Sequence, residues 1–264
     1  MTAPRVRLDA ELVRRGLARS REQAGELVTA GLVAVAGQQA AKPATQVARD
    51  APITVTDPGE PRYVSRGGRK LAGALAAFGD LPVAGRQVLD AGASTGGFTD
   101  VLLRAGAAHV VAADVGYGQL AWSLRTDPRV TVMDRVNVRA LQNVTPVPDL
   151  VVADLSFISL TLVLPALVAS ATQDADFVLL VKPQFEVGKD RVGAGGVVRD
   201  TTDRSASIRR VCEAAGQLGL GVRGITASPL PGPAGNVEYF VWLRRGAPPM
   251  DEDELSRAIE EGPS

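Results

Sequence analysis

From Gln87 onward, the chain alternates short, almost entirely apolar runs with longer segments whose apolar residues recur at helical spacing. Such runs are typical of strands that are buried on both faces, as in a parallel sheet. The runs cover residues 88–91, 110–113, 130–133, 150–153 and 177–181. Because helical segments connect them, the pattern predicts an α/β fold, a mostly parallel sheet with helices on both sides. Residues 222–227 and 237–243 predict two more strands at an antiparallel edge.

The composition is that of a globular chain with a sizeable core, since 45% of the 264 residues are hydrophobic and 22% are charged. One cysteine, Cys212, and one histidine, His109, cannot form an internal disulfide or a zinc site of Cys and His ligands. We interpret both as packing residues and expect no metal. A secretory signal peptide would need an apolar segment after Arg5 and Arg7, and the sequence has none there. No run reaches the roughly 18 apolar residues that a membrane-spanning helix needs. These observations predict a cytoplasmic protein without a membrane partner.

Charge is segregated along the chain although the formal net charge is zero. Residues 1–70 hold 12 Lys or Arg and 7 Asp or Glu, a net charge of +5, so the remainder carries −5. A basic N-terminal segment of this kind can bind phosphates. The alternative is a solvated charged surface without a ligand, which would have the same composition.

The first 55 residues have a pattern of their own. Apolar spacing predicts two short helices, the first ending at Gly16 and the second capped by Ser20 with Gln23, followed by strands at 32–35 and 53–55. The corner between the helices carries several arginines, whose fork-shaped donors suit phosphate oxygens. The predicted RNA-binding residues are Arg5, Arg7, Arg14, Arg15, Arg19, Arg21 and Lys42, with Arg66 and Arg69 further along the chain.

This segment resembles the RNA-binding module named after ribosomal protein S-four. The resemblance is carried by Arg7-Leu8-Asp9, Leu12, Gly16, Ser20-Arg21, Ala24, Gly31, Val33, Val35, Gly37 and Lys42-Pro43. A small packing domain without a ligand is the alternative. The breakers at 57–61 are typical of a linker, so we expect an RNA-binding domain at 1–59, a linker at 60–63 and a second domain at 64–264.

A glycine-rich turn follows the first strand of the second domain, with the sequence Asp-Ala-Gly-Ala-Ser-Thr-Gly-Gly-Phe at 90–98. Glycines let the backbone approach a ligand at the carboxyl edge of the strands. Ser94 stands where a dinucleotide fingerprint has its second glycine, so a pyrophosphate is disfavoured. Asp114 ends the next strand, where an acid can accept hydrogen bonds from ribose hydroxyls.

An acid-x-Gly-x-x-x-Gly-Gly turn with an acid at the next strand resembles the cofactor-binding half of the Rossmann-like, class I methyltransferases. The resemblance implies S-adenosyl-L-methionine (AdoMet) as cofactor, with its methionine part at the turn and its ribose at Asp114. Asn137 is either an adenine contact or a residue that caps its loop. The predicted cofactor-binding residues are Asp90, Gly92, Ser94, Gly96, Gly97, Phe98, Asp114, Asn137 and Asp154.

Two more polar residues, Asp154 and Lys182, directly follow apolar strands, so they should face the same edge of the sheet. With Lys70 and Glu238 they match, residue by residue, the Lys-Asp-Lys-Glu tetrad of FtsJ-type ribose 2′-O-methyltransferases. With the front module, the whole chain resembles the TlyA family, whose members are named haemolysins and act as rRNA methyltransferases.

The resemblance implies AdoMet-dependent methylation of a ribose 2′-hydroxyl, in cytidines of small- and large-subunit rRNA, by a monomer that binds ribosomal subunits. Lys182 would be the general base or would stabilise the developing oxyanion, and the sequence leaves both roles open. Lys70 would orient the ribose or a phosphate, Asp154 would position Lys182 and the methyl donor, and Glu238 would orient the lysines.

Two other functions stay open at this point. A haemolysin or cytolysin is suggested by the family's name, although the sequence offers neither a spanning helix nor a set of barrel strands. A ribosome-assembly factor that binds RNA and AdoMet without catalysis would differ from the enzyme only in failing to transfer a methyl group.

Overall fold

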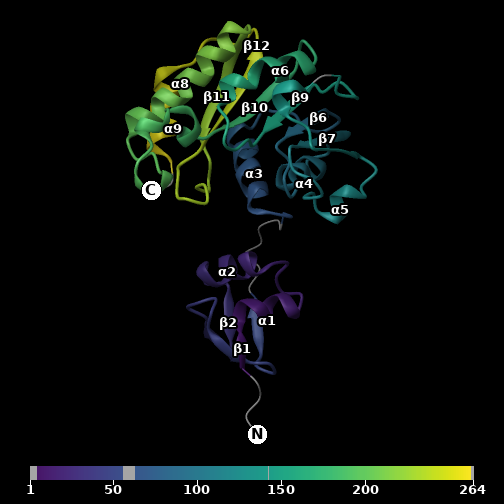
Figure 1. Cartoon of the computed structure of the whole chain (residues 1–264), viewed down its shortest axis with the longest axis vertical. Helices are drawn as coiled ribbons and strands as arrows, with labels where there is room; N and C mark the ends of the chain where they lie inside the picture. The colour runs from purple at the N-terminus through teal and green to yellow at the C-terminus, as the bar shows by residue number, and fades with distance from the viewer. Residues whose placement is uncertain (1–4, 56–62, 142, 263–264) are drawn as a thin grey trace. The chain divides into compact units, whose positions relative to one another are not determined.

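The computed structural model describes residues 5–55, 63–141 and 143–262. The chain forms two compact units, Met1–Arg62 and Tyr63–Ser264 (Figure 1). The boundary expected at residue 59 and positions 60–62 of the expected linker lie outside the described residues. Tyr63 already belongs to the second unit.

The first unit packs two helices, α1 (Leu8–Arg14) and α2 (Arg21–Thr29), around a small apolar core. Ser20 caps α2 as predicted, because its hydroxyl accepts a hydrogen bond from the backbone N–H of Gln23 over 3.1 Å. Gly16 follows α1 in the left-handed region, with φ of +70°. The strands are β1 (Arg5–Arg7), which pairs with β4 (Gln46–Ala48), and β2 (Val33–Val35), which pairs with β3 (Gln38–Gln39) and β5 (Ile53–Val55).

The second unit is built on a seven-stranded sheet whose order is β11-β12-β10-β9-β6-β7-β8. All neighbours are parallel except at β12, which runs antiparallel to β10 and β11. The predicted mixed sheet is therefore confirmed. The strands are β6 (Gln87–Ala91), β7 (His109–Asp114), β8 (Val130–Asp134), β9 (Leu150–Ala153), β10 (Asp176–Val181), β11 (Leu220–Ala227) and β12 (Tyr239–Arg245).

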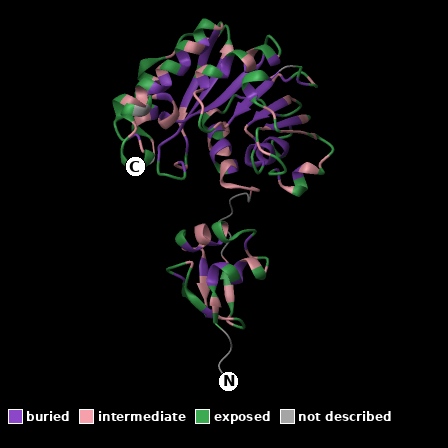
Figure 2. Cartoon of the chain, in the orientation of Figure 1, coloured by how far each residue is buried: buried purple, intermediate pink, exposed green. Residues whose placement is uncertain are grey.

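Helices cover both faces of this sheet, and its central strands β6, β9 and β10 are almost entirely buried (Figures 1 and 2). Alternate strand residues enter two separate cores: Leu89 and Val151 face one, and Val88 and Val152 face the other. The helices of the first core are α6 (Leu164–Ser170), α8 (Thr201–Gln217) and α9 (Glu252–Glu260). Those of the second are α3 (Arg66–Phe78), α4 (Gly97–Arg104) and α5 (Trp122–Arg125).

The direction of the winding reverses between β6 and β9. From β6 the chain proceeds to β7 and β8 on one side, whereas β9 leads to β10 on the other. Connections leave such a switch point in opposite directions, which opens a crevice at the carboxyl ends of the two strands. Asp90 and Ala91 end β6 at this crevice, and Asp154 directly follows β9.

Two details differ from the predictions. The last strand begins at Tyr239 rather than at residue 237, so Glu238 precedes the strand. The acidic end of the chain forms helix α9, whose residues Leu255 and Ala258 are buried in the core.

Candidate active site

Lys182 and Asp154 meet at the carboxyl edge of two neighbouring parallel strands. They follow the last residues of β10 and β9, so both side chains emerge at the same edge. The distance from Lys182 Nζ to Asp154 Oδ1 is 2.6 Å, and the same amine donates to Ser156 Oγ over 2.9 Å. The Asp154 side chain is 24% exposed and that of Lys182 is 9% exposed. This ion pair therefore lies at the carboxyl edge of the sheet and is partly open to solvent.

Glu238 and Lys70 form a second ion pair beside the first. Val181 pairs with Tyr239 across β10 and β12, so the residues next to them, Lys182 and Glu238, lie across from each other. Lys70 Nζ, on α3, lies 2.5 Å from Glu238 Oε2, and their side chains are only 8% and 1% exposed. The structure thus brings the four predicted residues to one edge as two ion pairs, one buried and one partly open.

The glycine-rich turn lies against the same edge. Gly92 has a φ of +86°, and a Cβ at this position would stand 2.5 Å from the carbonyl oxygen of Asp154. Gly96 has a φ of +96°, and its Cβ would meet Leu120 at 2.8 Å. A Cβ on Gly97 would lie 2.7 Å from the backbone nitrogen of Gly68 in α3. These glycines are therefore required by contacts within the protein as well as by any ligand that approaches the turn.

Asp114 ties the turn to the loop after β7. Its Oδ2 accepts a hydrogen bond from the backbone N–H of Ser94 over 2.8 Å, and its Oδ1 accepts one from that of Gly116 over 2.7 Å. The carboxylate is thereby fixed at the end of β7, where the sequence predicts a ribose contact.

Asp90 is completely buried at the end of β6. Its Oδ2 accepts a hydrogen bond from Thr99 Oγ1 over 2.6 Å, while Oδ1 is buried without a hydrogen-bond partner among the described residues. Burial, together with the negative charges of Asp154 and Asp114, raises the pKa of Asp90 to about 7. This buried carboxyl group would be stabilised in its ionised form by a nearby positive charge or donor.

Two of the predicted cofactor residues have structural duties. Phe98 is a buried core residue whose ring lies 5.9 Å from that of Phe240, so its side chain packs between α4 and the sheet. Asn137 is exposed, and its side-chain oxygen accepts a hydrogen bond from the backbone N–H of Arg139 over 3.0 Å. Asn137 therefore caps its loop, and the adenine contact stays a prediction.

In the first unit, the buried Asp9 holds two of the predicted RNA-binding arginines. Arg7 donates two hydrogen bonds to its carboxylate, over 2.8 and 3.0 Å, and Arg21 donates a third over 3.0 Å. These arginines hold the pKa of Asp9 well below its usual range. The acid fixes both guanidinium groups at the surface and offsets part of their charge.

Glu11 does the same for a second pair. Arg14 donates to Glu11 over 2.5 and 2.8 Å and Arg15 over 2.8 Å, and these bonds lower the pKa of Glu11 to about 2. The corner is less positive than a list of its arginines alone indicates, because Asp9 and Glu11 are paired with four of them.

The remaining candidates are mostly exposed. Arg19 donates to Gln23 over 3.3 Å, and Arg5 and Lys42 are exposed on the first unit. In the second unit, Arg66 donates to the carbonyl of Pro231 over 3.0 Å, and Arg69 is exposed on α3.

An aromatic pair that was not predicted lies beside the Lys182–Asp154 ion pair. Phe157 follows Ser156 by one residue, has a φ of +63° and is 91% exposed. Its ring centroid lies 5.2 Å from that of Phe185, three residues after Lys182. An exposed Phe in the left-handed region is uncommon and points to function. The sequence gives no signal for it beyond its position next to Asp154.

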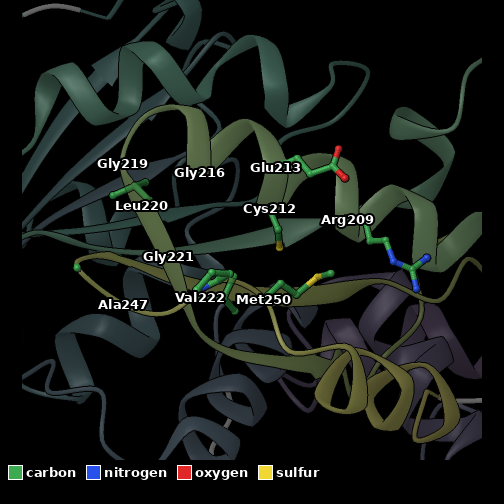
Figure 3. Close-up of a pocket in the computed structure, with 12 residues that line it drawn as sticks. Arg209, Cys212, Glu213, Gly216, Gly219, Leu220, Gly221, Val222, Ala247 and Met250 are labelled. Carbon is green, nitrogen blue, oxygen red and sulfur yellow. The ribbon is translucent and has the colours of Figure 1, made fainter.

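Away from this site, a pocket of about 490 Å³ opens where β11 begins and β12 ends, at the opposite edge of the sheet. Cys212 points from α8 toward the segment that carries Met250 (Figure 3). Burial raises the pKa of the Cys212 thiol to about 12, as expected for a packing residue. None of the predicted site residues lines this pocket.

Within residues 5–55, 63–141 and 143–262, no cluster of three or more His, Cys, Asp or Glu could hold a metal ion. No helix in the same part of the chain has the length and hydropathy to cross a membrane.

An open sheet with this strand order, a glycine-rich turn at its switch point and acids at the ends of β6 and β7 defines a Rossmann-like methyltransferase. The family model of FtsJ-like methyltransferases matches residues 63–245, and that of the S4 domain matches residues 6–53. The chain belongs to the FtsJ-like methyltransferase family and carries an S4 domain in front of it.

Full-length relatives share this arrangement. The 16S/23S rRNA (cytidine-2′-O)-methyltransferase TlyA of Mycobacterium tuberculosis is 61% identical over 99% of this chain and 100% of the relative. YqxC of Bacillus subtilis is described as a candidate rRNA methyltransferase. It is 42% identical over 99% of this chain and 95% of the YqxC chain. A solved structure described as a candidate hemolysin from Streptococcus thermophilus is 38% identical, with a TM-score of 0.76 over 98% of both chains.

The residues at the switch point fit AdoMet, the methyl donor of this class. AdoMet carries positive charge on its sulfonium and its amino group, and the carboxyl edge of the sheet gathers Asp90, Asp114 and Asp154. The buried Oδ1 of Asp90 has no hydrogen-bond partner among the described residues. Such a set of acids favours a cationic ligand. The three acids, and not the glycines alone, therefore support AdoMet as the cofactor.

Proposed function

We propose that this protein methylates the 2′-hydroxyl of cytidine ribose in the rRNA of both ribosomal subunits. The observation that carries the proposal is the contact of Lys182 with Asp154 and Ser156 at a partly open edge, next to the buried Lys70–Glu238 pair. The named activity of the M. tuberculosis relative supports the same reaction.

The chemical difficulty of this reaction is the weak nucleophilicity of a ribose hydroxyl at neutral pH. When bound, AdoMet supplies an electrophilic methyl group. Lys182 lies at the carboxyl edge of the sheet beside the partly exposed Asp154, so its ammonium group can stabilise negative charge as it develops on the 2′-oxygen. Asp154 and Ser156 hold the amine in one orientation, and general-base action by Lys182 would require its proton to leave first.

Lys70 and Glu238 act from deeper in the protein. Their ion pair joins α3 to the start of β12, which fixes the residue opposite Lys182 in the sheet register. We assign Lys70 to orienting the ribose or a phosphate and Glu238 to orienting Lys70. A pair that holds both elements in place contributes to rate by keeping the reacting groups aligned.

For the cofactor, Asp90, Gly92, Ser94, Gly96 and Gly97 are the candidates for its methionine part, Asp114 for its ribose, and Asp154 for the sulfonium side. Phe98 would contribute through its backbone, and the amide of Asn137 is the candidate for the adenine.

RNA would be bound by both units. The arginines fixed by Asp9 and Glu11 suit phosphate oxygens, and sequence-specific readers of RNA often stack unpaired bases on aromatic rings. Phe157 and Phe185 place such a surface beside Lys182. We propose that the protein works on ribosomal subunits as a cytoplasmic monomer.

The experiment is to map ribose methylations on rRNA from cells with and without the active gene product. We expect 2′-O-methylcytidines that disappear with the gene and return with the wild-type copy but not with Lys182→Ala. Identical maps in all strains would overturn the proposal and favour a non-catalytic assembly factor.

A further inference from the structure

The loop after β9, residues 154–160, is held at two points by one short segment, residues 182–186. At its start, Asp154 and Ser156 bind the amine of Lys182. At its end, Ser159 and Leu160 bind the carboxylate of Glu186. Lys182 immediately precedes α7 (Pro183–Glu186), and Glu186 is its last residue. The segment 182–186 thus carries both the candidate catalytic amine and a second anchor for the loop that the amine contacts.

The anchor at Glu186 is buried and specific. Ser159 Oγ donates to Glu186 Oε2 over 2.6 Å, and the backbone N–H of Leu160 donates to Oε1 over 2.8 Å. Leu160 begins the short 3₁₀ helix η2 (Leu160–Leu162) and is 2% exposed. The Glu186 side chain therefore accepts from the first turn of that helix, where backbone N–H groups lack partners within the helix.

The backbone of Glu186 is itself held by a hydrogen bond from α8. Arg210, on α8, donates to the backbone carbonyl of Glu186 over 2.6 Å. Glu186 is 3% exposed, and burial raises its pKa, so water competes little for its oxygens. The anchor lies on a helix that is held in turn by a long core helix.

We infer that Glu186 is a positioning residue for methyl transfer: its carboxylate sets the path of residues 154–160, so that Asp154 and Ser156 meet Lys182 in the productive geometry. The inference rests on the proposed function and adds to it a residue outside the tetrad. Phe157 lies between the two anchors, so the same carboxylate also sets where its exposed ring stands.

The test compares four variants of the full chain in methyl transfer to ribosomal subunits. Glu186→Ala removes both bonds, whereas Glu186→Gln can accept from the N–H of Leu160 and donate to Ser159. The matched control is Glu254→Ala, because Glu254 on α9 also accepts from a backbone N–H, that of Ile225, over 3.0 Å. Ser159→Ala removes one of the two bonds at the anchor and leaves Glu186 in place.

We expect Glu186→Ala to lower kcat by about 10²-fold, the cost of a misplacement near 1 Å, with the Kd for AdoMet changed by less than about threefold. Glu186→Gln should recover kcat to within about fivefold of wild type, and Glu254→Ala should stay within about twofold. A purely structural role would lower the apparent kcat and the number of AdoMet-binding sites together, in proportion to the loss of folded protein.

A folded Glu186→Ala variant with wild-type kcat would overturn the inference, and so would a Gln variant as slow as the Ala variant. If Glu186→Ala does not fold, Ser159→Ala decides: a lower kcat with unchanged AdoMet affinity supports the role, and an unchanged kcat contradicts it. A wild-type chain that transfers no methyl group would instead overturn the proposed function, and the inference with it.

Discussion

Lys70 and Glu238 are 168 residues apart in the chain, and their charged groups lie 2.5 Å apart in the folded second unit. Both side chains are almost completely buried, so each charge depends on the other for its stabilisation. This pair connects α3, which precedes the sheet, to its last strand, and it lies beside the more open pair of Lys182 and Asp154.

Removing one member of the buried pair should therefore be costly. Glu238→Ala leaves an ammonium group buried without its partner, and we expect it to lower the free energy of unfolding by about 3–5 kcal/mol. The double variant Lys70→Met/Glu238→Met removes both charges, so its free energy of unfolding should be close to that of wild type. It should still lack methyl transfer. Urea unfolding of the full chain measures the difference, and a single variant as stable as wild type would contradict this account.

The open pair should respond differently to two substitutions of Lys182. Lys182→Ala should abolish methyl transfer while AdoMet still binds, because the amine is not the cofactor's main support. Lys182→Arg keeps a permanent positive charge, so it should retain more turnover than the Ala variant if that charge stabilises the 2′-oxygen. Single-turnover rates measure both. Equal loss in the two variants would argue for a general base, and an active Ala variant would refute any role for this amine.

Asp90 should make cofactor binding depend on pH. Its pKa in the folded protein is about 7, above the ordinary value of 3.8. The ionised form attracts a cation, so we expect AdoMet affinity to rise as the pH increases from 6 to 8. Titration calorimetry measures this trend, and Asp90→Asn should flatten it.

The same pKa shift has the opposite effect on the stability of the cofactor-free protein: AdoMet affinity should rise with pH, whereas stability should fall. Between pH 4 and 7 the folded chain keeps a proton that the unfolded chain has lost, so the contribution of Asp90 to stability decreases as the pH rises through this range. Thermal unfolding of the cofactor-free wild type and Asp90→Asn should diverge in that window. An identical pH profile in the two proteins would show that Asp90 does not titrate there.

The turn at Gly92 should not tolerate a side chain. Gly92→Ala would place a Cβ 2.5 Å from the carbonyl oxygen of Asp154 in a backbone conformation with φ of +86°. Gly85 is the matched control, since its φ is +78° and an added Cβ would meet nothing within 4 Å. We expect Gly85→Ala to cost about 1–2 kcal/mol of stability through its backbone alone, and Gly92→Ala to lose AdoMet binding as well. Normal affinity in Gly92→Ala would mean that the turn can shift without consequence.

The fold was predictable because it depends on patterns that a sequence displays directly. Apolar runs such as those ending at Ala153 and Val181 indicate buried parallel strands, and the polar residue after each run falls at the functional edge. The short strand Arg5–Arg7 was missed because three alternating residues carry too little periodicity. Helix α9 was missed because its acidic surface obscured the apolar residues Leu255 and Ala258.

The site was predictable only in part. The four charged residues were found through a resemblance, but their division into a buried and an open pair depends on tertiary packing that no spacing reveals. Phe98 was assigned to the cofactor because it follows the glycines; its ring packs on Phe240, and a cofactor contact through its backbone stays a prediction. Glu186 follows Lys182 by four residues with no pattern that marks it, and its contact with residues 159 and 160 arises only when β9 and β10 pair.

The most direct test uses purified protein, isotopically labelled AdoMet and ribosomal subunits assembled with either cytidine or 2′-deoxycytidine at the mapped positions. We expect label in 2′-O-methylcytidine with the ribose substrate and none with the deoxy substrate, because the reaction consumes the 2′-hydroxyl. Label on the base, or equal labelling of both substrates, would contradict the account.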